Sequence, residues 1–210
     1  MTNGNNKVLG EVEMARKQQE KSKQTKNELM RSAENLFGQK GFMATTVAEI
    51  TAHAGYSKGS FYRHWVSKDK LFMEIVENKL KEYRSSRDER LYKANSLEEV
   101  MHIIWDFLEI IVRDENWAKV FLEFTVYASR IPELRNDLSL SQYRLSEKVF
   151  AELVSDFVET DYPPEKLGAF NTVLFEGYMV QSALGTGIVD LKDIRGAALT
   201  VALANGLKEV

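Results

Sequence analysis

The sequence predicts an all-α fold, and three observations lead to this class. Apolar residues recur at spacings of three and four along most of the 210 residues, as in helices with one buried face. No segment alternates apolar and polar residues over the length of a strand. The chain holds only three prolines, at positions 132, 163 and 164, so helices can run unbroken over long stretches.

The first helix is expected to begin at Thr25. Residues 1–24 are polar and contain two glycines, and we expect them to form a mobile basic arm that leads into this helix. Thr25 has capping-box spacing to Glu28, which is typical of a helix start. Gly38 and Gly41 bracket the end of the helix. Its apolar stripe consists of Leu29, Met30, Ala33, Leu36 and Phe37.

Two short helices joined by a tight turn are predicted next. Thr46 and Glu49 again have capping-box spacing and open a helix over residues 46–53. Gly55 follows, and glycine readily adopts the positive φ that ends many helices. The second short helix is expected over residues 57–64.

The remainder of the chain reads as long helices. One is expected from Lys68 to about Arg90, with Ser67 as its N-cap. From Asn95 onward the sequence is nearly continuous amphipathic helix, which favours a small first domain over residues 25–72 and a helical bundle over 73–210. The further helices are expected over residues 96–112, 115–129, 132–160 with a bend near 139, 163–184 and 190–208.

Composition excludes several classes of site. The chain has no cysteine, which excludes disulfides, thiolate metal sites and cysteine nucleophiles. The three histidines, His53, His64 and His102, lack metal-ligand spacing, so we expect no metal and no cofactor. The longest uncharged stretch, residues 177–189, is too short to cross a bilayer, and no signal peptide is visible. We expect a cytoplasmic protein without a membrane partner.

The net charge of −3 argues against nucleic-acid binding only when it is taken as a total. Residues 1–72 hold 12 basic and 7 acidic side chains, a net charge of +5. Residues 73–210 hold 16 basic and 24 acidic side chains, a net charge of −8. The basic part contains the two short helices and the N-terminal arm with Arg16, Lys17, Lys21 and Lys23, which can reach phosphates.

The two short helices have the arrangement of a helix-turn-helix. Phe61 and Trp65, four residues apart, face inward from the second helix. Gly59 allows the backbone to approach phosphates closely. The outer side of this helix is polar and carries Lys58, Ser60, Tyr62, Arg63 and His64.

Residues 25–71 resemble the DNA-binding domain of the tetracycline-repressor (TetR/AcrR) family. The departure is Trp65, where the family usually has phenylalanine. The matching residues are Ala33, Leu36, Phe37, Gly41, Phe42, Thr45, Thr46, Val47, Ile50, Ala54 through Tyr62, His64, Trp65, Ser67, Lys68, Asp69 and Leu71.

The resemblance implies a role for each matching residue. Thr46 would cap the first short helix and donate to a phosphate, and Lys68 would hold a backbone phosphate. Ser57, Lys58, Gly59 and Ser60 would meet the major groove. Tyr62 and His64 would contact phosphates or base edges, with Arg63 nearby. The family also implies a homodimer, here through residues 163–208, a palindromic DNA operator and a small-molecule effector that releases it.

Each of these residues also has a plainer interpretation. Lys58 and Lys68 can be solvated surface lysines. Tyr62 and Trp65 can both be core aromatics; we favour the core for Trp65 and DNA for Tyr62, since Phe61 and Trp65 already anchor the helix.

Aromatic residues are concentrated in the second half of the chain, and most of them must be ordinary core. Helical bundles nevertheless hold ligands between helices, in mostly apolar pockets with few polar groups. We therefore expect a site for an apolar or amphipathic molecule. Its candidate walls are Trp105, Phe121, Phe124, Tyr127 and Tyr178, and its candidate polar contacts are His102, Asn171 and Gln181.

The leading hypothesis is a ligand-responsive transcriptional regulator, most simply a repressor, and no catalytic signature argues for an enzyme. The last two helices carry many small or apolar residues, more than one subunit can easily cover. Two alternatives stay open: a helical small-molecule carrier or enzyme without DNA function, and a helical protein–protein adaptor.

Overall fold

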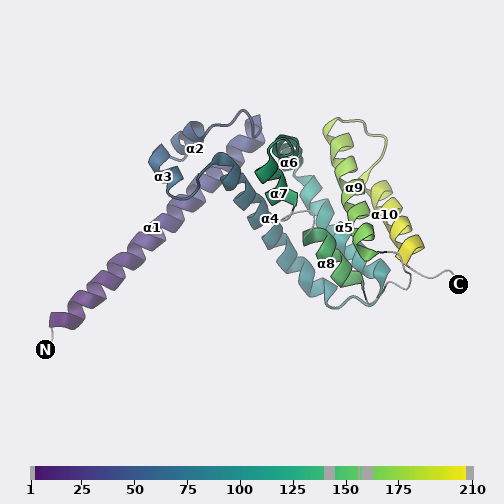
Figure 1. Cartoon of the computed structure of the whole chain (residues 1–210), viewed down its shortest axis with the longest axis horizontal. Coiled ribbons are helices and arrows are strands. Elements are labelled where there is room, and N and C mark those ends of the chain that lie inside the picture. Colours follow the sequence, from purple (N-terminus) through teal and green to yellow (C-terminus); the bar gives the residue numbers. More distant parts are fainter. Residues whose placement is uncertain (1–2, 140–144, 156, 158–162, 207–210) are drawn as a thin grey trace. The chain divides into compact units, whose positions relative to one another are not determined.

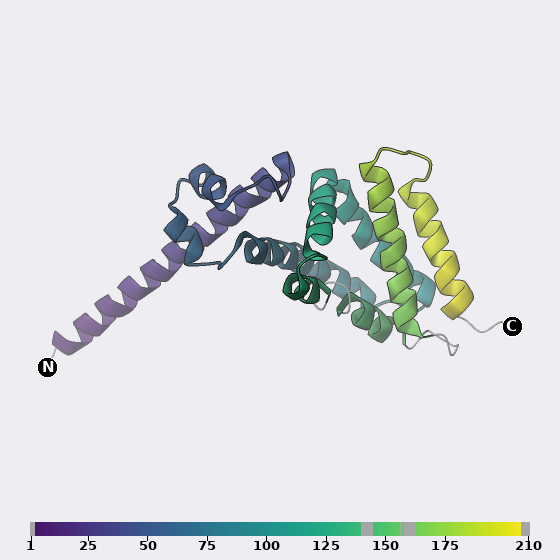
Figure 2. The same cartoon turned by 45° about the horizontal axis from the view of Figure 1, so that its top comes forward.

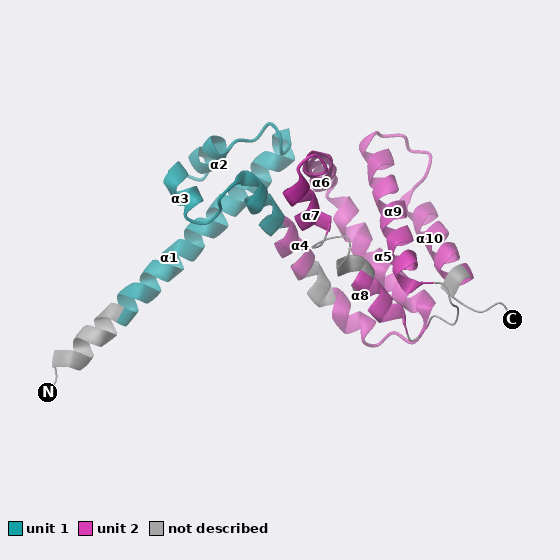
Figure 3. Ribbon diagram, viewed as in Figure 1, with its two compact units in different colours: residues 1–75 teal, residues 76–210 magenta. Residues whose placement is uncertain are grey.

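The structure, a computed structural model, describes residues 3–139, 145–155, 157 and 163–206. Ten helices and no strand occur within these residues, which confirms the all-α class (Figure 1). The chain divides into residues 1–75 and residues 76–210 (Figure 3), where the sequence suggested a division near residue 72. No described helix is both long and apolar enough to cross a membrane.

The first unit contains α1 (Asn3–Lys40), α2 (Val47–His53), α3 (Lys58–Tyr62) and the start of α4 (Lys68–Leu91). Its core is aromatic: the rings of Phe37, Phe42 and Phe72 lie with centroids 5.2–5.6 Å apart and all three side chains are fully buried. The two pairs made by Phe72 are edge-to-face, a geometry that adds to the burial of apolar area. This cluster fixes the end of α1 and the start of α4.

The expected start of the first helix is wrong. Helix α1 begins at Asn3, so residues 3–24 are helical and Thr25 lies in the helix interior. The Thr25 hydroxyl donates to the Lys21 carbonyl at 3.0 Å, four residues back, instead of capping a new helix. Ion pairs Glu13–Lys17 and Arg16–Glu20 at i,i+4 spacing support this polar helix.

The second unit is a bundle in which α9 packs against α8 and α10 (Figure 2), and α10 packs against α5. At its centre the buried Trp105 donates its indole N–H to the amide oxygen of Asn171 at 2.9 Å. The helices are α5 (Leu97–Arg113), α6 (Glu115–Ala128), α7 (Pro132–Leu138), α8 (Leu145–Val154), α9 (Pro164–Ala183) and α10 (Leu191–Gly206).

Capping residues mark most predicted helix starts. Ser96 accepts from the Glu99 N–H at 3.2 Å, and Thr46 and Glu49 form a complete capping box. The single helix expected over residues 132–160 is wrong, because α7 ends at Leu138 and α8 ends at Val154. The rest of that prediction, at 140–144 and 158–160, lies outside the described residues, as do positions 207 and 208 of the predicted dimer helix.

Candidate functional site

The turn between α2 and α3 is built on Gly55. Its φ of +75° lies in the left-handed region, which glycine adopts without strain. The Gly55 N–H donates to the Ala52 carbonyl at 3.2 Å and the Tyr56 N–H donates to the Thr51 carbonyl at 2.8 Å. This pair of bonds is the Schellman motif, which ends a helix and sends the chain off in a defined direction. The two short helices are thereby joined by a tight turn, as the sequence predicted, although α3 ends at Tyr62 rather than at residue 64.

Helix α3 presents an exposed polar face. Ser57 is its N-cap and accepts from the Ser60 N–H at 3.3 Å. The side chains of Lys58, Tyr62 and Arg63 are exposed, and the Tyr62 side chain is 56% exposed despite its ring contact with Phe61. These residues and the exposed Gly59, four members of the predicted DNA-contact set, lie on one surface.

Ser60 is the member of that set which the structure turns inward. Its side chain is 7% exposed, and its hydroxyl lies 3.2 Å from the Ser57 hydroxyl and accepts from the Arg63 guanidinium at 3.1 Å. Ser60 therefore positions Ser57 and Arg63 within the exposed face.

Two aromatic side chains hold α3 on the rest of the unit. Phe61 is fully buried and Trp65 is 4% exposed, with ring centroids 5.4 Å apart. The Trp65 indole N–H donates to the Glu74 carboxylate at 2.7 Å, and Lys26 pairs with the same carboxylate at 2.6 Å. The core interpretation of Trp65 is confirmed.

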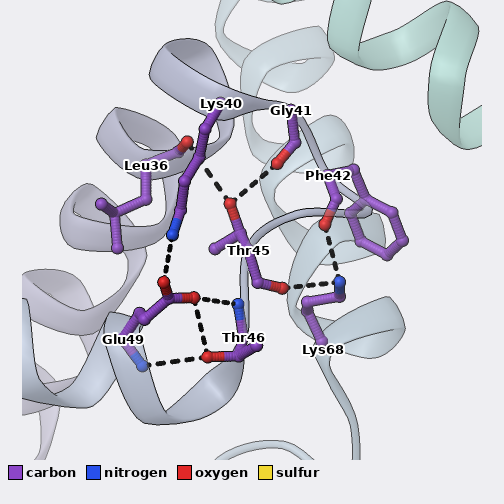
Figure 4. A network of polar contacts seen from close by, with 8 residues as sticks. All are labelled: Leu36, Lys40, Gly41, Phe42, Thr45, Thr46, Glu49 and Lys68. Atoms are coloured by element: carbon purple, nitrogen blue, oxygen red, sulfur yellow. Dashed lines mark hydrogen bonds and ion pairs between the residues drawn. The ribbon is translucent and has the colours of Figure 1, made fainter.

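The start of α2 carries a charged network (Figure 4). The Thr46 N–H and hydroxyl both donate to one oxygen of Glu49 at 2.8 Å, and Lys40 donates to the other oxygen. The bond from Lys40, followed by those from Thr46, lowers the pKa of Glu49 to about 2. Glu49 is therefore ionised at neutral pH, and it already accepts the hydroxyl hydrogen for which a phosphate contact by Thr46 would compete.

Lys68 has a second role in the same network. Its ammonium donates to the carbonyls of Phe42 and Thr45 at 2.6 and 2.7 Å and lies 4.1 Å from the centre of the Phe42 ring. Lys68 thus ties the start of α4 to the loop that precedes α2, as Figure 4 shows. Its predicted phosphate contact remains a prediction beside this structural role.

His64 lies at the rear of the exposed face and is half-buried, with its ring 5.4 Å from that of Trp65. Burial lowers its pKa, and the nearby charges of Lys26 and Arg63 lower it further. The lowered pKa favours the neutral imidazole at physiological pH in the protein without DNA.

The second unit contains a cavity of about 180 Å³ between α4, α5, α6, α8 and α9. Phe121 and Asn171 are the two predicted ligand residues that line it. At its wall Gly168 packs so closely on Phe150 that an added Cβ would lie 3.2 Å from that side chain. Lining residues that the sequence reading missed include Lys79, Arg87, Ile104, Phe107, Trp117 and Phe175.

The other six predicted ligand residues lie elsewhere. Trp105 and Phe124 are fully buried in the core, and Tyr127 and Tyr178 are half-buried. Gln181 is exposed on α9.

His102 belongs to a polar cluster away from the cavity. Its Nδ1 lies 2.8 Å from the Arg195 guanidinium, which also binds Asp106 at 2.8 Å. Asp106 in turn accepts from Arg90 at 2.7 Å. These contacts join α4, α5 and α10 and give His102 a structural partner. Within the described part of the chain, no three His, Asp or Glu side chains gather as they would around a metal ion.

The family model for bacterial regulatory proteins of the tetR family matches residues 29–75, which contain all of α2 and α3. The HTH-type transcriptional repressor AcnR of Corynebacterium efficiens is 25% identical over 174 residues, 81% of this chain and 88% of that protein. The HTH-type transcriptional regulator AcrR of Shigella flexneri is 33% identical over 151 residues, 67% of this chain and 69% of that regulator.

The chain belongs to the TetR family. The fold agrees: the TetR-family repressor FadR of Thermus thermophilus, solved in complex with lauroyl-CoA, superimposes with a TM-score of 0.65 at 20% identity, over 88% of this chain and 96% of that one. As a TetR-family protein the chain is a DNA-binding transcriptional regulator, and α2 and α3 form its helix-turn-helix.

Proposed function

We propose that this TetR-family regulator is a homodimeric repressor of a palindromic operator, released when a small molecule enters the cavity of the second unit. The observation that carries the proposal is the exposed face of α3, where Lys58, Gly59, Tyr62 and Arg63 share one surface held by buried aromatic residues. A short helix with such a face fits a major groove, with half-sites about 34–36 Å apart in a dimer.

In this proposal Lys58 and Arg63 bind phosphates or guanine edges, and Tyr62 donates its hydroxyl to a phosphate. Ser57 and Gly59 allow close approach of the helix start to the backbone. His64 accepts or donates one neutral hydrogen bond. Thr46 and Lys68 add phosphate contacts at the edge of the motif. The protein acts by binding rather than by catalysis, in the cytoplasm, where it reaches its operator.

Helix α9 supports the dimer because it is apolar on two opposite faces. One face is buried within the subunit through Leu167, Asn171, Phe175 and Met179. The opposite face is exposed and carries large apolar side chains at i, i+3, i+10 and i+14. These are Phe170, Val173, Val180 and, at the C-cap, Leu184, exposed by 42%, 65%, 42% and 72%. A helix with two apolar faces is typically covered on both.

Helix α10 offers a complementary surface of small side chains. Ala197, Thr200 and Ala204 follow at i, i+3 and i+7 and are exposed, while Ala198 and Ala202 face the core. Small residues allow two helix backbones to approach closely. Two copies of α9 and α10 would form a four-helix interface around a two-fold axis.

Helix α4 connects the proposed effector site to DNA. It begins at Lys68, next to the helix-turn-helix in sequence, and supplies Val76, Lys79, Leu80 and Arg87 to the cavity wall. A ligand that binds more tightly when α4 is displaced would change the distance between the two copies of α3 in the dimer. Coupling of this kind is reciprocal and typically amounts to ~1–3 kcal/mol.

The test is an electrophoretic mobility shift with a palindrome from the DNA upstream of the protein's own gene. We expect specific binding that the substitutions Lys58→Ala and Tyr62→Ala each weaken at least tenfold. Lys119→Ala, an exposed lysine of α6 that is 52% exposed, serves as the matched control and should bind normally. Binding that ignores sequence and vanishes at moderate salt would refute a specific reader and favour the adaptor or carrier hypotheses.

A further inference from the structure

The cavity of the second unit is apolar over most of its wall, and few of the described lining residues can recognise a polar head group. Apart from the indole of Trp117, its neutral polar side chains are Asn171 and Thr172, and its charged side chains are Lys79, Arg87 and Glu176. Which of these groups has hydrogen-bonding capacity for a ligand decides what chemistry the cavity selects.

The neutral polar groups are already satisfied within the protein. The Asn171 amide oxygen accepts from Trp105 at 2.9 Å, and its NH₂ group donates to the Leu167 carbonyl at 2.9 Å and lies 3.8 Å from the Met101 sulfur. The Thr172 hydroxyl donates to the Gly168 carbonyl at 3.2 Å. Breaking such buried bonds to bind a ligand carries a desolvation penalty. Recognition of a head group therefore falls to the charged residues.

Arg87 is a largely enclosed charge of this wall. Its side chain is only 12% exposed, and its guanidinium lies 5.4 Å from the centre of the Phe107 ring. Two of its nitrogens approach a single oxygen of Asp88, at 2.8 and 3.1 Å, but Asp88 is 63% exposed, so water screens that partner. A nearly buried cation gains from a second, desolvated anion, and the planar guanidinium suits a carboxylate.

Lys79 adds a second positive charge to the same wall. Its ammonium lies 4.7 Å from the centre of the Trp117 ring. Both cations come from α4, and Glu176 is the acidic residue among the described lining residues, while Asp88, the partner of Arg87, lies outside that lining. The described lining side chains therefore carry one more positive than negative charge. Positive charge beside aromatic rings favours an anion attached to an apolar body.

We infer that the effector is an amphipathic anion whose carboxylate or similar group binds Arg87 and whose apolar body lies among Phe107, Phe121 and Phe175. The volume of about 180 Å³ sets the size of that body, because a cavity of roughly 150 Å³ admits benzene. A short alkyl chain or a single aromatic ring therefore fits. The inference rests on the proposed effector-release function and narrows the ligand class.

The test uses three probes that share one alkyl chain and differ in head group: octanoate, octan-1-ol and octylammonium. Isothermal titration calorimetry of the full chain should give octanoate at least tenfold tighter binding than octan-1-ol. Arg87→Gln should reduce octanoate to the level of octan-1-ol and leave octan-1-ol unchanged. Arg113→Gln, in a 75% exposed arginine of α5, is the matched control and should retain the preference for octanoate.

Arg87→Lys keeps the positive charge, so its comparison with Arg87→Gln separates the effect of the charge from an effect on folding. Circular dichroism during heating checks that each variant is folded. Equal affinities for the three probes, tightest binding of octylammonium, or no binding of any of them would each overturn the inference. Operator release is measured separately by mobility shift. A protein that binds octanoate through Arg87 yet keeps its operator would refute effector release while the head-group assignment stands.

Discussion

Trp65 illustrates how one side chain can replace another without disturbing a fold. A phenylalanine at this position, usual in the family, would fill the same core but could not donate to Glu74. Here the indole N–H makes that bond at 2.7 Å, and Lys26 pairs with the same carboxylate. The larger ring thus adds a polar anchor between α3 and α4.

Trp65→Phe should lower the free energy of unfolding by about 1 kcal/mol, through the lost hydrogen bond and a small cavity. Glu74 keeps Lys26 and partial solvent exposure, so no buried charge is left unpaired. Urea unfolding followed by circular dichroism measures the change. Operator affinity should stay within twofold of the unchanged protein, and a larger loss would mean that the ring contributes to DNA binding.

Glu49 gives a pH-dependent prediction. Its pKa falls from the ordinary 4.5 to about 2 in the folded protein, so its stabilising effect is complete above pH 4.5 and disappears as the pH falls to 2. Glu49→Gln should therefore destabilise the protein at pH 7 and make little difference near pH 2. Urea unfolding over this range checks the trend. In a Lys40→Met background the difference at pH 7 should shrink, and an unchanged difference would contradict the role of Lys40.

At the scale of the elements, two glycines near the α2–α3 turn allow the effect of backbone strain to be tested separately from the effect of contact with DNA. Gly55 has φ of +75° and nothing lies within 4 Å of an added Cβ, so Gly55→Ala should lower stability by about 1 kcal/mol through strain alone. Gly59 has no positive φ, and its added Cβ would meet only the Ser57 hydroxyl at 3.7 Å. Gly59→Ala should therefore fold normally, which thermal melting checks. It should weaken operator binding, which a mobility shift measures. Equal thermal stability of the two variants would refute this distinction.

The N-terminal half of α1 supports a prediction about salt dependence. Residues 12–24 are exposed along their whole length, so removal of residues 2–20 should leave the melting temperature of the rest unchanged. If Lys17 and its basic neighbours reach phosphates, removal should lower operator affinity and reduce the slope of log affinity against log salt by about 0.9 per lost contact. Replacement of Arg16 and Lys17 by glutamine, which keeps the helix, should act in the same direction. An unchanged slope in both variants would show that this segment does not contact DNA.

Capping boxes predicted the helix starts well except in one case. Thr46–Glu49 and Ser96–Glu99 mark true starts, whereas Thr25–Glu28 has the same spacing inside α1. The difference lies upstream, because residues 3–24 contain no proline and carry ion pairs that sustain a helix. Spacing alone therefore identifies a candidate cap, and the preceding segment decides whether it is used.

At the scale of the whole molecule, the exposed stripe of α9 predicts the assembly. Val173→Arg places a charge in the proposed two-fold interface and should shift the protein towards monomer in sedimentation velocity. Operator affinity should fall at least tenfold, because a monomer binds a single half-site. Val126→Arg, at a 59% exposed valine of α6, is the matched control and should remain dimeric. A dimeric Val173→Arg protein would exclude this face of α9 as the interface.

The exposed face of α3 could be predicted from sequence, whereas the cavity largely could not. Phe61 and Trp65, within and just after the five-residue helix α3, identify its inner face, and the polar residues must then lie outside. For the bundle, helical spacing does not say which neighbour each face meets: Phe121 lines the cavity, while Phe124, one turn later, lies in the core. From sequence alone Lys79 and Arg87 are expected on a solvated helix face. Their aromatic partners, Trp117 and Phe107, are distant in sequence and are identified only by the structure.

Gly168 has a consequence for how this regulator can diverge. Glycine and alanine codons differ by a single base, and an alanine Cβ at this position would press on Phe150 at 3.2 Å. Both residues line the cavity, so the displaced ring would change its shape while α2 and α3 stay as they are. One mutation could thus give two gene copies different chemical signals and the same operator. A single substitution is therefore enough to begin the divergence of two paralogues that bind different effectors and share one promoter.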